Sequence, residues 1–206
     1  MTTILGIQGD GFCVVGCDSR IADIYEGGSV TVSVMGDSTR KIFPNHQYIL
    51  GAAGDVRAVN ILAHTFVPPV PKMNVKGFSI DAFITTEFIP ALRTCFELTG
   101  YATSEKESSR LAQFDSEILV ALNGQIYVIG GDYSWSSDSH GLYAMGTGAS
   151  YAMGALLATV PIVRTMISAR KAILKALSIA ARCDPFTGAP YHTMSQDNKT
   201  RSRKAN

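Results

Sequence analysis

The chain begins Met1-Thr2-Thr3, so removal of the initiator methionine would expose a threonine hydroxyl and a free α-amine on one residue. A threonine hydroxyl attacks carbonyl carbons poorly unless a base takes its proton, and an N-terminal amine is a base that the nucleophile itself carries. The unperturbed pKa of this amine, about 7.7 to 8.0, leaves part of it neutral near pH 7. Thr2 is therefore a candidate nucleophile. Small residues follow methionine in very many cytosolic proteins, so the rest of the chain must decide.

Length and charge narrow the class of protein. At 206 residues the chain suits one globular domain, which we expect to cover residues 1–195, followed by a polar basic tail at 196–206. A formal net charge of +1 gives no long-range field that would gather nucleic acid or an anionic membrane. Apolar residues make up 46% of the chain and charged residues only 17%, which favours surfaces buried against further copies of the chain.

Neither the cysteines nor the histidines have the spacing of a metal site, so we expect no metal and no cofactor. Buried reduced thiols are the simplest interpretation of the four cysteines, Cys13, Cys17, Cys95 and Cys183. No apolar run reaches the roughly 20 residues that span a bilayer, and the N-terminus lacks the regions of a signal peptide. The expected location is the cytoplasm of a prokaryote, or of a prokaryotic cell infected by a virus.

Strand signals dominate the first quarter of the chain. β-Branched and apolar residues over 2–18 surround Gly9-Asp10-Gly11, a strong hairpin signal. The stretch over 25–37 predicts another hairpin or an extended loop. Two short strands are expected at 41–43 and 47–50, around a Pro44-Asn45 turn and before a run of small residues.

Helix signals follow in two groups. Asp55 and Ser79 are candidate N-caps, and Pro90 should kink or restart the second helix, which runs to about Gly100. A hairpin around Asn123-Gly124 and a strand at 142–145 come next, and then helices at 150–159 and 168–182 and a closing strand. Segregated runs of strands and helices indicate an α+β fold. Two antiparallel sheets stacked face to face, each covered by a helical pair, satisfy this order without being forced by it.

Six short blocks resemble a proteasome β subunit and its bacterial ATPase-partnered relative, in the family's order and over nearly the whole chain up to the tail. They are Thr2-Thr3-x-x-Gly6-Ile7, Gly16-Cys17-Asp18-Ser19-Arg20, Lys41-Ile42, Gly51-Ala52-Ala53-Gly54-Asp55, Gly146-Thr147-Gly148-x-x-Tyr151-Ala152 and Arg182-x-Asp184-x-x-Thr187-Gly188. The resemblance implies the four-layer αββα sandwich of the N-terminal nucleophile hydrolases. It also implies a threonine-type endopeptidase with Thr2 as nucleophile.

The resemblance assigns roles to the residues around Thr2. Lys41 matches a buried lysine whose charge lowers the pKa of the threonine hydroxyl, and Asp18 matches the carboxylate that keeps this lysine charged and oriented. Without the resemblance, an Asp-Lys pair would be read as a surface salt bridge. Gly51 matches the residue whose backbone N–H stabilises the oxyanion, in a run that would otherwise be an ordinary tight turn before a helix.

Three further residues match the positions around the α-amine. Asp184 and Thr147 match those that hold the amine and its water, and Thr187 supplies a second hydroxyl nearby. The family commonly has serine where this chain has Thr147 and Thr187. Threonine keeps the hydroxyl but adds a methyl group and restricts χ1.

The resemblance also implies a first side-chain pocket for the substrate, lined by Ile21, Phe43, Ile49, Ala53 and Arg57. Four of these residues are apolar, which predicts cleavage after apolar residues. The interval from Asp18 to Lys41 is several residues longer than the family usually shows. We expect the extra length to project as a loop or hairpin that alters the substrate cleft or a contact between subunits.

The resemblance also implies a homo-oligomeric ring or stacked rings, peptide or unfolded-protein substrates, and an ATP-dependent unfoldase as partner. Two alternatives remain open: a non-catalytic ring subunit that retains the fold, with or without Met1, and a small-molecule amidase with the same nucleophile. The mass of the N-terminus distinguishes the first alternative, because a retained methionine leaves Thr2 without a free amine. Activity on acyl amides without activity on peptides would indicate the second.

Overall fold

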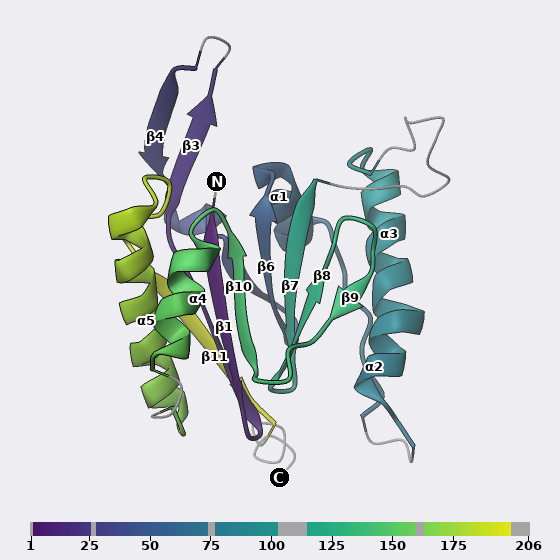
Figure 1. Cartoon of the computed structure of the whole chain (residues 1–206). Coiled ribbons are helices and arrows are strands. Elements are labelled where there is room, and N and C mark those ends of the chain that lie inside the picture. Colours follow the sequence, from purple (N-terminus) through teal and green to yellow (C-terminus); the bar gives the residue numbers. More distant parts are fainter. Residues whose placement is uncertain (1, 26–27, 74–76, 103–114, 160–162, 199–206) are drawn as a thin grey trace.

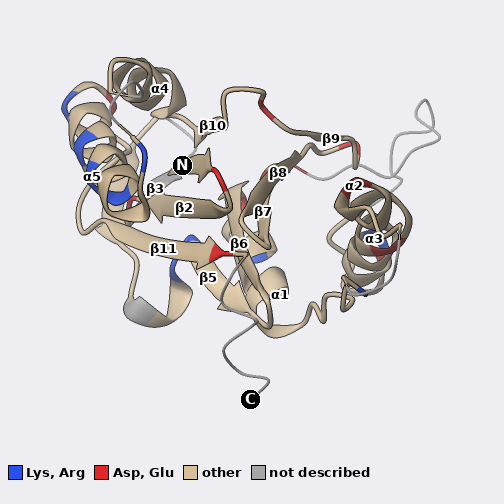
Figure 2. Cartoon of the chain, turned by 90° about the horizontal axis from the view of Figure 1, so that it is seen from below, with Lys and Arg blue, Asp and Glu red and all other residues tan. Residues whose placement is uncertain are grey.

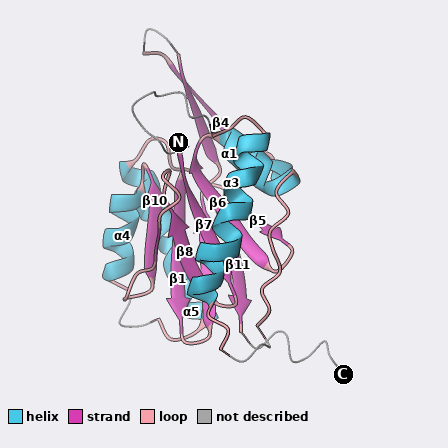
Figure 3. Ribbon diagram, turned by 90° about the vertical axis from the view of Figure 1, so that its right-hand side faces the viewer, coloured by secondary structure: helices cyan, strands magenta, loops and turns pink. Residues whose placement is uncertain are grey.

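The computed structural model describes residues 2–25, 28–73, 77–102, 115–159 and 163–198, which form four layers (Figure 1). Two sheets face each other in the middle. Helices α4 and α5 cover the outer face of one sheet, and α1, α2 and α3 cover the outer face of the other. The predicted α+β sandwich of stacked antiparallel sheets is confirmed. Figure 3 shows the same layers from the side.

The first sheet has the strand order β10-β1-β2-β11 and is antiparallel throughout. Its strands are β1 (Thr3–Gly9), β2 (Phe12–Cys17), β10 (Leu142–Gly146) and β11 (His192–Asp197). The predicted hairpin joins β1 to β2, and Gly11 has the positive φ of 72° that a tight turn favours. The closing strand β11 continues two residues beyond the expected domain end at 195, and 199–206 lie outside the described residues.

The second sheet has the order β5-β6-β7-β8-β9. Its strands are β5 (Ile42–Asn45), β6 (Tyr48–Gly54), β7 (Ser116–Leu122), β8 (Gln125–Ile129) and β9 (Trp135–Ser136). The hairpin around Asn123-Gly124 is where the sequence predicts it. The turn between β5 and β6 lies instead at His46 and Gln47, because Pro44 and Asn45 still pair with β6.

The helices over the second sheet begin at the predicted caps. Helix α1 (Val56–His64) starts after Asp55, whose Oδ1 accepts a hydrogen bond of 2.8 Å from Arg57 N. Ser79 caps a helical run made of α2 (Ile80–Phe83), the π-helical segment η2 (Ile84–Phe88) and α3 (Ile89–Leu98). The π turn lies directly before Pro90, whose missing N–H interrupts the regular ladder.

The other helical pair is α4 (Ala149–Leu157) and α5 (Met166–Cys183). Thr165 and Ser168 form a reciprocal capping box at the start of α5. Lys and Arg residues recur along α5 (Figure 2), and Arg170, Lys171, Lys175 and Arg182 are exposed. In the described ranges, no helix is both long and apolar enough to cross a membrane.

Three apolar clusters hold the layers together, one beneath each helical layer and one between the sheets. Cys13 and Cys17 belong to the central cluster, where burial raises the pKa of each thiol to about 12. All four cysteines are free, as expected. The expectation that all are buried is wrong, because Cys183 is exposed at the end of α5 and Cys95 is partly exposed.

The longer segment between Asp18 and Lys41 forms a two-stranded hairpin of β3 (Arg20–Ile24) and β4 (Val30–Val34), followed by a short 3-10 turn η1 (Asp37–Thr39). It projects beyond the sandwich at the end where the chain begins (Figure 1). The predicted projecting hairpin is therefore present. The base of the hairpin lies beside the first residues of β1, because Arg20 N and Thr3 N both donate hydrogen bonds to the carboxylate of Asp18.

Candidate active site

The carboxylate of Asp18 organises the end of the first sheet and is completely buried. Its Oδ1 accepts hydrogen bonds from Thr3 N at 2.9 Å and from Lys41 Nζ at 2.6 Å. Its Oδ2 accepts bonds from Arg20 N at 2.9 Å and Gly188 N at 3.1 Å. Four donors therefore fix this carboxylate and tie the start of β1, the base of the hairpin and the 184–188 loop to one point.

Lys41 is a buried cation just before β5, with 3% of its surface exposed. Its Nζ donates to Asp18 Oδ1 and to the carbonyl oxygen of Arg20, both at 2.6 Å. Burial lowers the pKa of Lys41, and the charge and hydrogen bond of Asp18 offset part of that effect. The pair is thus a buried ion pair rather than the surface salt bridge that an arbitrary Asp-Lys pair would form.

Asp184 anchors a second network on the opposite side of β1. Its Oδ2 accepts hydrogen bonds from Thr147 Oγ1 at 2.8 Å and Thr187 Oγ1 at 2.6 Å. Thr3 Oγ1 lies 2.6 Å from Thr187 Oγ1. Since the Thr187 hydroxyl proton is directed to Asp184, Thr3 must be the donor in that contact. Both threonine hydroxyls, those of Thr147 and Thr187, therefore donate to Asp184 Oδ2.

Two glycines let the strand that carries Thr2 approach this network. Thr3 pairs with Gly146 across the sheet. A Cβ atom on Gly146, which has a φ of 87°, would overlap the carbonyl oxygen of Thr2. A Cβ atom on Gly148 would collide with the hydroxyls of Thr3 and Thr187. Gly146 is therefore required by the close backbone of Thr2, and Gly148 by the close side-chain oxygens of Thr3 and Thr187.

Thr2 is 5% exposed and lines two hollows. The first, called here the apolar hollow, is narrow, about 10 Å³, and is lined by Thr2, Ile21, Met35, Lys41, Ala52, Gly54, Asp55, Val56 and Val59. The second, called here the Glu117 hollow, measures about 520 Å³ and is lined by Thr2, Ala53, Gly54, Glu117, Gly146 and Thr147. Both hollows share Thr2 and Gly54, so Thr2 lies at their junction.

The predicted substrate-pocket residues do not all lie beside Thr2. Ile21 lines the apolar hollow and Ala53 the Glu117 hollow. The guanidinium of Arg57 donates to Thr99 O at 2.7 Å instead. Phe43 packs toward the outer helical layer and lines a separate hollow beside α1.

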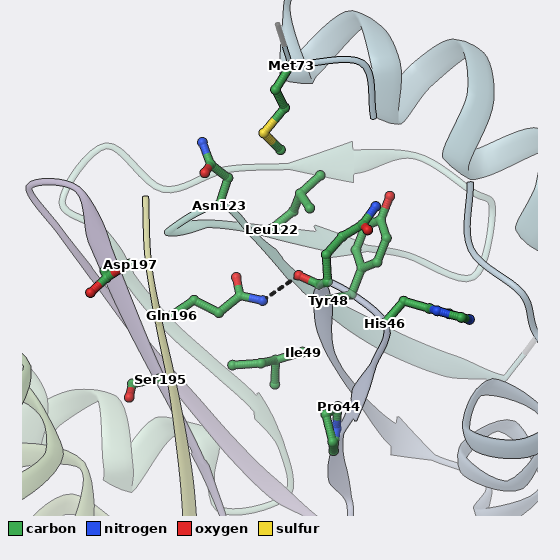
Figure 4. Close-up of a pocket in the computed structure, with 11 residues that line it drawn as sticks. Pro44, His46, Tyr48, Ile49, Met73, Leu122, Asn123, Ser195, Gln196 and Asp197 are labelled. Atoms are coloured by element: carbon green, nitrogen blue, oxygen red, sulfur yellow. Dashed lines mark hydrogen bonds between the residues drawn. The ribbon is translucent and has the colours of Figure 1, made fainter. Parts of the chain in front are cut away.

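Ile49 lines a hollow of about 430 Å³ at the other end of the sandwich, shown in Figure 4. There Gln196 Nε2 donates to the carbonyl oxygen of Gln47 at 2.7 Å, which ties β11 to the β5–β6 turn. Ile49 and Ala53 both face the space between the sheets, but they lie four residues apart along β6, so Ala53 is near Thr2 and Ile49 is not. Ala52 faces the helix side, whereas Ile49 packs between the sheets.

Gly51 lies inside β6 opposite Leu119 of β7. Ala52 N donates to the carbonyl oxygen of Lys41 at 3.3 Å, so Ala52 N–H points toward β5. Successive N–H groups along a strand point to opposite edges, so Gly51 N–H points toward β7, and Gly54 N–H points to the same edge as Ala52. Gly54 lines both hollows with Thr2, whereas neither includes Gly51. The sequence motif indicates Gly51, but the direction of each N–H depends on how β6 pairs with its neighbours, which the motif does not show.

Residues that the sequence analysis gave no role also contribute to the site. Thr3 links the two networks through its N–H and hydroxyl. Arg20 Nη1 donates to Pro185 O at 2.7 Å and holds the 184–188 loop against the hairpin. Both belong to blocks that carry the resemblance, which was a usable signal. Glu117 had none. Across the described residues, no group of three or more potential ligands from His, Cys, Asp and Glu is placed to hold a metal ion.

No family model matches the sequence, and none of the curated proteins matches it. Solved structures do match. The structure of Thiobacillus denitrificans BPH has a TM-score of 0.71 at 19% identity, with 97% of this chain and 100% of that chain covered. BPH in complex with epoxomicin gives 0.70 at 17% identity, with 96% and 100% covered. Eukaryotic HslV from Trypanosoma brucei gives 0.61 at 18% identity, with 95% and 99% covered.

Likeness at this level of identity concerns the fold. It extends over nearly the whole of this chain and of each matching chain. The chain therefore has the fold of BPH and HslV, in agreement with the resemblance of its sequence to the proteasome β-subunit-like family.

Proposed function

We propose that the chain is a threonine-type endopeptidase whose nucleophile is Thr2 after removal of Met1. One observation carries the proposal: two hydrogen-bond networks converge on Thr3, the first residue of β1. Asp18, paired with Lys41, binds the backbone N–H of Thr3, and Asp184 holds the Thr3 hydroxyl through Thr187 and also binds Thr147. Because the two networks fix the position of Thr3, they also restrict the position of the adjoining Thr2. A catalytic nucleophile needs such fixed placement relative to its substrate.

In the proposed reaction the α-amine of Thr2, through one water molecule, takes the proton of its own Oγ1. The oxygen attacks the peptide carbonyl carbon, and the charge of Lys41 stabilises the developing alkoxide. Collapse of the tetrahedral intermediate breaks the C–N bond, and the protonated amine gives its proton to the leaving nitrogen. Water then hydrolyses the ester and restores Thr2.

The oxyanion of that intermediate needs a backbone donor beside Thr2. Gly51 is the residue that the family motif indicates. The direction of the N–H groups along β6 makes Gly54 the better candidate here, because Gly54 shares both hollows with Thr2. Loss of such a donor costs about 2.7 to 4 kcal/mol of transition-state stabilisation.

The apolar hollow is the proposed site for the side chain that precedes the cleaved bond. Its walls come largely from Ile21, Met35, Ala52, Val56 and Val59. Its volume of about 10 Å³ is close to that of one water-sized probe, so it favours the smallest apolar side chains, alanine as it stands and valine after a shift of its walls. The preference for an apolar side chain agrees with the sequence-based prediction. The residues that line the hollow differ in part from the predicted ones, because Ala52 of β6 and Val56 and Val59 of α1 take the place of Phe43, Ile49 and Arg57.

Assembly and partners follow from the resemblance and are part of the proposal. We expect a homo-oligomeric ring or stacked rings with the sites enclosed, and an ATP-dependent unfoldase that feeds unfolded chains. The projecting β3–β4 hairpin exposes Val30, Val32 and Val34 and is a candidate surface for subunit contacts.

Hydrolysis of a fluorogenic peptide with alanine or valine before the dye tests the proposal. Processed protein should cleave the peptide, and epoxomicin, the compound present in one BPH structure, should inhibit the reaction. Cleavage of simple acyl amides without cleavage of peptides would favour the amidase alternative. No turnover by protein that has lost Met1 would favour the structural-subunit alternative.

The pH dependence should be bell-shaped. Activity is expected to rise as the α-amine of Thr2 loses its proton, around its ordinary pKa of about 7.7 to 8.0. It should fall again when Lys41 loses its charge, and because burial lowers the pKa of Lys41, this limb should lie below the ordinary value of 10.5. A profile of kcat/KM from pH 5 to 11 measures both limbs. Activity that stays level beyond pH 10.5 would remove Lys41 from the mechanism.

A further inference from the structure

We infer that Glu117 makes this site select peptides with a positively charged side chain, Lys or Arg, next to the apolar residue. Glu117 lies on β7 directly opposite Ala53 of β6, and its side chain is exposed. It lines the Glu117 hollow together with Thr2. The proposed cleavage chemistry gives this carboxylate no task. The inference rests on the proposed function, because it concerns the substrate of the same site.

The Glu117 hollow is acidic at its wall. Among the described residues that line it, Glu117 is the one with an ionisable side chain, and the others are glycine, alanine and threonine. Asp184 lies behind Thr147 and accepts its hydroxyl. Lys41, the buried cation of the site, lines the apolar hollow instead and is tied to Asp18. Apart from the α-amine that removal of Met1 frees on Thr2, a cationic side chain that enters the Glu117 hollow therefore meets a negative charge without a competing cation from its lining.

The two hollows are placed to bind the side chains of two neighbouring substrate residues. Both include Thr2 and Gly54, so a peptide bound across Thr2 passes over their junction. Adjacent side chains of an extended peptide point to opposite sides. When one side chain enters the apolar hollow, its neighbour is therefore directed toward the Glu117 hollow.

The expected size of the preference for a cationic side chain follows from the exposure of Glu117 to solvent. Glu117 is exposed, and an exposed ion pair contributes little, so the preference for a cationic over a neutral side chain should be about twofold to fivefold at low salt. It should shrink as salt screens the pair. A preference of this size changes the choice of peptide rather than the rate of the chemical step.

Binding measurements on Thr2→Ala protein test the inference without turnover. Dye-labelled peptides that differ in one residue, Lys, Gln or Glu on either side of a central valine, are titrated by fluorescence anisotropy at low and high salt. The Lys peptide should bind about twofold to fivefold more tightly than the Gln peptide, and the Glu peptide more weakly. Glu117→Gln should abolish the difference, and Glu117→Lys should reverse it.

Glu87→Gln is the matched control, because Glu87 is an exposed glutamate on the outer helical layer of the same sheet. This variant should keep the Lys-over-Gln ratio. An unchanged ratio in Glu117→Gln, or no binding of any of the peptides, would overturn the inference. A ratio that depends on Glu117 in protein that never hydrolyses peptides would leave the inference standing and refute the peptidase proposal instead.

Discussion

Thr2→Ala should lower peptide hydrolysis by roughly 10³-fold or more, because it removes the proposed nucleophile. Fold and assembly should be unchanged. The bonds that fix the start of β1 come from Thr3, whose N–H binds Asp18 and whose hydroxyl binds Thr187, so alanine at position 2 leaves them in place. Steady-state hydrolysis of the fluorogenic peptide measures the loss, and size-exclusion chromatography checks assembly.

Thr2→Ser is the matched variant, since serine keeps the hydroxyl and the α-amine. It should retain a measurable part of the activity after removal of Met1. Turnover by Thr2→Ala at the wild-type rate would refute the mechanism. An equal loss in the serine variant would point to a requirement for the threonine methyl rather than for the hydroxyl alone.

The second large effect concerns the buried Asp18–Lys41 pair. Asp18→Asn and Lys41→Met should each lower the free energy of unfolding by about 3 to 5 kcal/mol, because each leaves one buried charge without its partner. The double variant should lose less than the sum of the single variants, since it removes both charges. Hydrolysis should be lost in all three. Urea unfolding measures the free energies.

An exposed pair on α3 is the control for that cycle. Arg93 Nε lies 2.7 Å from Glu97 Oε1, and nearly half of each side chain is exposed. Glu97→Gln should change the free energy of unfolding very little, because solvent screens the pair. Strict additivity in the Asp18–Lys41 cycle, or a cost no larger than that of Glu97→Gln, would contradict the account of a coupled buried pair.

Local signals in the sequence predicted much of the fold. Asn123-Gly124 marked the β7–β8 hairpin, Asp55 marked the start of α1, and Pro90 marked the irregularity before α3. The position of the β5–β6 turn was missed, because cross-strand pairing extends through Pro44 and Asn45 to the edge of the sheet. Pairing of that kind depends on the partner strand and leaves no local signature.

The site was predictable where a motif carried it. The residues matched to the charge pair and the hydroxyl network, Asp18, Lys41, Thr147, Asp184 and Thr187, do lie together around the start of β1. Residues lining the hollows were harder to foresee. Ile49 and Ala52 are three positions apart in one strand, yet face opposite sides of the sheet. Glu117 reaches the site only through the register of β6 and β7.

The central claim is that a free Thr2 amine makes this chain a peptidase. Intact-mass measurement on the purified protein, paired with hydrolysis of the apolar fluorogenic peptide by the same sample, tests it most directly. The account predicts that the species without Met1 hydrolyses the peptide and that an engineered form with a blocked N-terminus does not. Equal turnover by the blocked form, or no turnover by fully processed protein, would contradict it.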